Sequence, residues 1–178
     1  MPSEPEFAEW TEEEGVELKA LLVGLRLRVA AAESLTAGRV QALLGAVSGA
    51  SGYFAGGVTT YTGELKQRLL DVDPKAGAVH WVSQAVAEEM AQGVCWMFEC
   101  EMGVATTGYA EPDAAKGVTT PFAWWAVCGP DGVERSGRVE GTGLGRTQMQ
   151  AKVAGAALRG LLAVLREKRY LTPSPRGS

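Results

Sequence analysis

The chain has 178 residues, of which 46% are hydrophobic and 21% are charged, as in an ordinary globular protein of one domain. Its formal net charge is −4 and its basic residues do not cluster, which argues against a nucleic-acid partner. With 23 Gly and many Ala, the composition favours helices packed closely on a sheet over a leucine-rich helical bundle.

Cysteine and histidine are too few for the common metal sites. The three cysteines include no CxxC pair, and His80 is the single histidine, so we expect no metal, no cofactor and no disulfide framework. Reduced thiols are typical of a cytoplasmic protein. The acidic N-terminus has no signal core, and no apolar run reaches the roughly 20 residues of a membrane span. We therefore predict a cytoplasmic protein without a membrane partner.

Hydrophobic periodicity and capping residues divide the chain into ten elements. In chain order they predict a helix over 12–24, a strand over 27–32, a helix over 38–47, a strand over 57–61, helices over 63–70 and 84–98, a strand over 102–106, a hairpin with strands over 122–127 and 133–139, and a helix over 147–167. This order predicts an α/β protein with a mixed sheet and helices on both faces. We expect one domain over 10–168, with disordered tails over 1–9 and 171–178.

Ser34 follows the first predicted strand and precedes a predicted helix. At a helix N-terminus, free backbone N–H groups can hold an anion or a developing oxyanion, and the small residues Ala37 and Gly38 let a ligand approach the backbone. Serine is also a common N-cap, so the spacing alone leaves both a nucleophile and a structural cap open.

A serine nucleophile needs a base, and the sequence offers two candidates. His80 lies in a predicted loop, which is the usual place of a surface histidine. Lys66 lies one turn into a predicted helix, five residues after Tyr61, and a Ser–Lys pair requires a lysine with a lowered pKa. From the residues alone, Lys66 also fits a solvated helix position and Tyr61 a strand end.

Two further segments could line the same edge of the sheet. Thr107 and Gly108 follow a buried strand, and ligands of α/β sheets bind outside the carboxyl ends of strands. Arg146, at the start of the last helix, is a candidate for anion binding. An ordinary polar loop and a surface arginine remain the alternatives.

These motifs together resemble the CinA C-terminal domain family of nicotinamide-mononucleotide amidohydrolases, from about residue 16 to residue 166. The resemblance rests on Ala32-Glu33-Ser34 with Thr36 and Gly38, on Ser48-Gly49-Ala50-Ser51 with the Gly56-Gly57-Val58 strand, on Tyr61-Thr62-Gly63-Glu64-Leu65-Lys66, and on Val82-Ser83 with its helix. It implies a three-layer α/β/α fold in a stand-alone form. It also implies an enzyme with a nucleotide-like small-molecule substrate, which hydrolyses the carboxamide of nicotinamide mononucleotide to give the nicotinate nucleotide and ammonia.

The resemblance implies roles for nine residues. Ser34 would be the nucleophile, Lys66 its base and Tyr61 a hydroxyl that assists proton transfer. Substrate contacts would come from Glu33, Thr36, Gly38, Thr107, Gly108 and Arg146. The flat Ala- and Gly-rich helix faces are compatible with a homo-oligomer.

The chain departs from the family pattern in one loop. Where the family has a Gly-rich segment, this sequence has acidic residues at Glu111 and Asp113. A carboxylate near a substrate phosphate is repulsive by about 1 kcal/mol even in a watery site. Two alternatives therefore stay open: an amidase for another substrate, or a catalytically silent domain that binds a ligand or a protein partner.

Overall fold

The computed structural model describes residues 7–78 and 80–171, and its elements follow the predicted order. They are α1 (Glu12–Leu25), β1 (Val29–Glu33), α2 (Arg39–Gly45), β2 (Phe54–Thr59), α3 (Gly63–Leu70), α4 (Gln84–Phe98), β3 (Met102–Tyr109), β4 (Phe122–Gly129), β5 (Gly132–Glu140) and α5 (Arg146–Leu171). The sheet order is β2-β1-β3-β4-β5. Strand β1 is parallel to both β2 and β3, and β4 is antiparallel to both β3 and β5. The predicted mixed sheet is confirmed.

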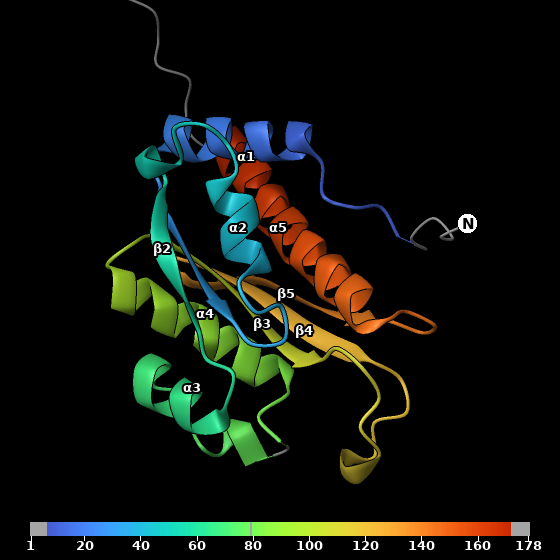
Figure 1. Ribbon diagram of the computed structural model, residues 1–178. Helices are drawn as coiled ribbons and strands as arrows, with labels where there is room; N and C mark the ends of the chain where they lie inside the picture. The colour runs from blue at the N-terminus through green and yellow to red at the C-terminus, as the bar shows by residue number, and fades with distance from the viewer. Residues whose placement is uncertain (1–6, 79, 172–178) are drawn as a thin grey trace, which may run out of the picture.

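The sheet is the middle of three layers. Helices α1, α2 and α5 lie on one face, and α3 and α4 lie on the other (Figure 1). Within β1, Val29 and Ala31 join the core under the first group of helices, and Ala30 and Ala32 join the core under α4. This alternation follows from the two-residue period of a strand. The predicted helices on both faces are confirmed.

Local signals in the sequence fix several of these elements. Three helices have a hydroxyl N-cap in the residue before their first turn: Thr11 for α1, Thr62 for α3 and Ser83 for α4. Each of these hydroxyls accepts a hydrogen bond from the backbone N–H three residues further on. The adjacent Trp124 and Trp125 pack against opposite faces of the sheet. None of the helices in the described part of the chain is long and apolar enough to cross a membrane.

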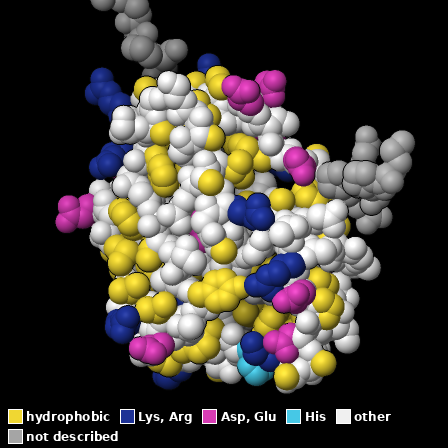
Figure 2. Space-filling model, viewed as in Figure 1, with side chains coloured by type: hydrophobic (Ala, Val, Ile, Leu, Met, Phe, Trp, Pro, Cys, Tyr) yellow, Lys and Arg dark blue, Asp and Glu magenta, His cyan; other side chains and the backbone are white. Residues whose placement is uncertain are grey.

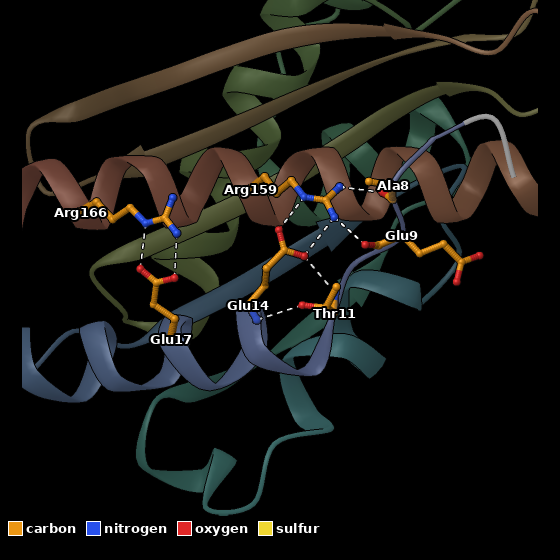
Figure 3. A network of polar contacts seen from close by, with 7 residues as sticks. All are labelled: Ala8, Glu9, Thr11, Glu14, Glu17, Arg159 and Arg166. Atoms are coloured by element: carbon orange, nitrogen blue, oxygen red, sulfur yellow. Dashed lines mark hydrogen bonds and ion pairs between the residues drawn. The ribbon is translucent and has the colours of Figure 1, made fainter.

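Helix α1 is joined to α5 by a polar network (Figure 3). The bonds run from Arg159 to the Glu14 carboxylate and to the carbonyls of Ala8 and Glu9, and from Arg166 to Glu17. Ala8 and Glu9 belong to the predicted N-terminal tail, so the structure ties the end of that segment to the domain. The rest of the predicted tails, residues 1–6 and 172–178, lies outside the described residues. Helix α5 extends to Leu171, four residues beyond its predicted end.

The parallel strands place three chain segments at one edge of the sheet. In the register of β1 with its two neighbours, Glu33 is level with Thr59 of β2 and Thr106 of β3. The residues after Glu33 and after Thr59 therefore leave the sheet side by side at its carboxyl edge, where α/β proteins bind ligands. Strand β3 continues along β4 to Tyr109, so the prediction that Thr107 and Gly108 follow the strand is wrong.

Candidate active site

A cavity of about 740 Å³ opens at this carboxyl edge. Of the nine predicted site residues, the five that line it are Ser34, Tyr61, Lys66, Gly108 and Arg146. Glu33, Thr36, Gly38 and Thr107 do not line it. The structure thus separates the predicted set into groups that a ligand can reach and groups that lie behind them.

Ser34 and Lys66 form a direct pair at the floor of the cavity. Lys66 Nζ donates a hydrogen bond to Ser34 Oγ over 3.1 Å. Lys66 is only 2% exposed and Ser34 only 6%. Burial lowers the pKa of Lys66 from 10.5 to about 8, because a low-dielectric environment disfavours the ammonium. No carboxylate within the described residues forms an ion pair with this amine. A neutral Lys66 is therefore available to take the hydroxyl proton of Ser34.

The turn that carries Ser34 differs from the prediction. Helix α2 begins only at Arg39, after Gly38 with a φ of +98°, so the prediction that Ser34 lies at a helix N-terminus is wrong. The Ser34 N–H instead donates to the carbonyl of Thr106 over 3.0 Å. Leu35, the next residue, lines the cavity, and its N–H has no protein acceptor among the described residues. An unpaired N–H directly after the hydroxyl is suited to binding an oxyanion.

The carboxylate of Glu33 explains why the helix N-terminus is not an anion site. Glu33 is fully buried and accepts hydrogen bonds from the Thr36 hydroxyl and from the N–H groups of Gly38, Val40 and Gln41. Because these donors already have a partner, they cannot bind a substrate anion as well. The geometry favours a structural role for Glu33, Thr36 and Gly38, in which they hold the turn that presents Ser34.

Thr107 also acts behind the cavity surface. Its side chain is buried, and its hydroxyl donates to the backbone carbonyl of Trp81 over 3.0 Å. Trp81 lines the cavity and fills the space beside two glycines: a Cβ at Gly63 or at Gly77 would lie 2.2 or 2.4 Å from its ring. Trp81 is not among the predicted site residues, and glycines at a helix start and in a loop are the sequence signal that a large ring packs against them.

Tyr61 lies at the mouth of the cavity and has a different partner from the one expected. It is 50% exposed, and its hydroxyl accepts a hydrogen bond from Arg146 Nη2 over 2.6 Å. The hydroxyl makes no hydrogen bond to Ser34 or Lys66. Arg146 Nη1 in turn forms an ion pair with Glu111 over 2.5 Å. The three side chains form a chain of polar contacts across the entrance.

The acidic residues of the altered loop are both paired. Glu111 forms its ion pair with Arg146, and Asp113 Oδ2 lies 3.3 Å from the Nζ of Lys116. Lys116 also lines the cavity. Charged side chains of both signs are interspersed with hydrophobic ones on the face seen in Figure 2, with no large patch of a single sign. The cavity mouth therefore has local cations, but each one already has a protein carboxylate beside it.

Comparisons with known proteins agree with this architecture. The family model described as CinA C-terminal domain matches residues 12–165. A CinA-like protein of Chlorobaculum tepidum is 39% identical over 155 residues, which cover 84% of this chain and 37% of that protein. A CinA-like protein of a Synechococcus strain is 39% identical over 135 residues, or 73% of this chain and 32% of that protein. The chain thus spans little more than a third, at most, of these curated relatives.

A solved structure shows the same fold over nearly its whole length. The crystal structure of a competence-damaged protein (CinA) superfamily protein from Klebsiella pneumoniae has a TM-score of 0.80 and 27% sequence identity, and the match covers 87% of this chain and 97% of that one. The family match, the curated relatives and the shared fold lead to one conclusion: the chain belongs to the CinA C-terminal domain family.

Proposed function

We propose that this domain is an amide hydrolase that converts the carboxamide of nicotinamide mononucleotide, or of a related pyridine amide, into a carboxylate and ammonia. The observation that carries the proposal is the 3.1 Å bond between Lys66 Nζ and Ser34 Oγ inside the cavity. A buried amine beside a serine hydroxyl is the arrangement of a Ser–Lys hydrolase. The substrate class comes from the family resemblance.

In the first half of the reaction, Ser34 attacks the substrate. Neutral Lys66 takes the hydroxyl proton while Ser34 Oγ bonds to the carboxamide carbon, and the carbonyl oxygen becomes an oxyanion that the Leu35 N–H can bind. The protonated Lys66 then gives its proton to the amide nitrogen. The carbon–nitrogen bond breaks, ammonia leaves, and an acyl ester remains on Ser34.

In the second half, water replaces ammonia. Lys66, neutral again, removes a proton from a water molecule that attacks the ester carbon, and then returns a proton to Ser34 Oγ as the ester bond breaks. The product is the carboxylate. A single base therefore serves both half-reactions, which requires its pKa to lie near the working pH.

The test is ammonia release from purified protein with nicotinamide mononucleotide, with the product identified by mass. Ser34→Ala should lower the rate by about a thousandfold or more, as loss of a nucleophile does in other serine hydrolases, while the thermal midpoint changes little. Ser51→Ala, on an exposed serine away from the cavity, is the matched control and should keep wild-type activity. Release that survives in Ser34→Ala would contradict the mechanism.

One observation favours a second substrate class at the same site. Arg146, the cation best placed to meet a substrate phosphate, is already paired with Glu111. A doubly anionic phosphate must displace this carboxylate and then remain beside it, so a pyridine riboside amide, which lacks the phosphate, fits the mouth better. If no pyridine amide gives Ser34-dependent ammonia, the domain is a ligand-binding member of the family instead.

A further inference from the structure

A second cavity lies at the opposite edge of the sheet from the candidate active site. Its volume is about 770 Å³, and all three cysteines of the protein line it. Cys95 comes from the last turns of α4, Cys100 from the connection to β3, and Cys128 from the end of β4 (Figure 1). Nothing in the proposed hydrolysis uses these thiols.

The end of α4 brings two of the thiols together. The N–H of Cys100 donates to the carbonyl of Cys95 over 3.1 Å, the N–H of Glu99 donates to that of Trp96 over 3.3 Å, and Glu99 has a φ of +48°. This pair of bonds is the Schellman motif, which is frequently accompanied by an apolar contact between the side chains at its two outer positions. Here Cys95 and Cys100 occupy these positions, and both line the cavity.

The surroundings of Cys95 let its sulfur face its neighbours. Gly103 of β3 provides the space for this side chain, because a Cβ at that position would lie 2.7 Å from Cys95 Sγ. The Cys95 thiol interacts with the thiols of Cys100 and Cys128, and this interaction raises the pKa of Cys95. The same interaction with Cys95 lowers the pKa of both Cys100 and Cys128.

Exposure distinguishes the two possible partners of Cys95. Cys128 is only 4% exposed, and its thiol donates to the carbonyl of Gly129. Cys100 is partly exposed at the cavity, and its thiol donates to the carbonyl of Met102 over 3.3 Å. An oxidant that enters from solvent therefore meets Cys100 first, with Cys95 behind it.

We propose that Cys100 and Cys95 form a peroxide-sensitive dithiol that closes to an intramolecular disulfide. The Cys100 thiolate attacks one oxygen of hydrogen peroxide and breaks the O–O bond. This gives a sulfenic acid on Cys100 and hydroxide, which takes the thiol proton to become water. The Cys95 thiol then attacks the sulfenic sulfur, a second water leaves, and the S–S bond forms. Overall, two thiols are oxidised, and one peroxide is reduced to two waters.

The test uses the wild-type protein and a small molar excess of hydrogen peroxide, followed by alkylation of the remaining thiols and digestion after glutamate. Cleavage after Glu99 and Glu101 places Cys95 in peptide 90–99 and Cys100 in peptide 100–101. The expected product is these two peptides joined, two hydrogens lighter than their sum, with Cys128 alkylated. The protein should remain at its original size on a non-reducing gel.

Two variants make the assignment specific. Cys100→Ala should abolish the cross-linked peptide, and the matched control Cys128→Ala should retain it. A wild-type link between Cys95 and Cys128, a link between two chains, or a Cys100 oxidised to sulfinic acid without any link would overturn the proposal. The wild-type peptide map decides the question even if a variant fails to fold.

Discussion

The buried Lys66 predicts a specific pH dependence for the proposed hydrolysis. Burial lowers its pKa from 10.5 to about 8, and this shift raises the fraction of neutral Lys66 at pH 7 by about 300-fold. At pH 7, roughly a tenth of the molecules then hold the neutral base that the mechanism needs. We expect kcat/KM to rise about tenfold per pH unit below pH 8 and to level off above pH 9.

The assay is the initial rate of ammonia release at subsaturating substrate between pH 6 and pH 10. Lys66→Arg keeps the positive charge but cannot lose its proton in this range, so activity should be lost at every pH. Lys75→Arg, on an exposed lysine outside the cavity, is the matched control and should keep the wild-type profile. A flat profile, or one that still rises steeply above pH 10, would refute the assignment of Lys66 as the base.

The same pKa has a consequence for stability. Between pH 8 and pH 10.5 the unfolded chain, with an ordinary lysine, binds more protons than the folded chain, so the free energy of unfolding rises with pH across this window. At about 1.4 kcal/mol per pKa unit, the lowered pKa of Lys66 makes the free energy of unfolding roughly 3 kcal/mol smaller below pH 8 than above pH 10.5. Lys66→Met should therefore be more stable than wild type at pH 7 by up to that amount, with a flatter pH dependence in urea unfolding. Equal pH dependence in the two proteins would show that burial does not perturb Lys66.

Three further perturbations test other parts of the structure. Glu111→Gln should raise kcat/KM for nicotinamide mononucleotide relative to its riboside, which lacks the phosphate, by about fivefold, the equivalent of roughly 1 kcal/mol of charge repulsion; an unchanged ratio would show that Glu111 does not select the substrate. Thr60→Val removes a buried hydroxyl that has no hydrogen-bond partner among the described residues, so urea unfolding should show a gain of about 1 kcal/mol, and a loss would mean that the hydroxyl is satisfied. Arg159→Ala should cost about 1–3 kcal/mol at pH 7. Because Arg159 lowers the pKa of Glu14 below 4.5, this cost is present above pH 4.5 and should shrink in urea unfolding at pH 3; a constant cost would contradict the ion pair.

Much of the architecture follows from local signals in the sequence. The order of helices and strands follows from periodicity, and the hydroxyl caps at Thr11, Thr62 and Ser83 mark three helix starts, because each cap is satisfied within its own first turn. The opposite orientation of Trp124 and Trp125 likewise follows from the two-residue period of a strand. Such features depend on neighbours a few residues away, so the sequence alone specifies them.

The contacts at the site depend on tertiary structure. The motif at Ser34 indicates a helix N-terminus, but the Glu33 carboxylate turns inward and takes the N–H groups of α2, which moves the helix start to Arg39. The sequence also names Tyr61 and Arg146 without showing that they bond to each other.

Which side chains meet depends on strand register, helix position and side-chain direction together. Ser34 and Lys66 are 32 residues apart and come within 3.1 Å only because β1 and β2 are parallel neighbours, so that the turn after β1 and the start of α3 lie at the same edge of the sheet. No pattern within a short stretch of sequence encodes that pairing. Local patterns along the chain therefore specify the elements and the candidate residues, whereas the packing of those elements specifies which candidates share a cavity.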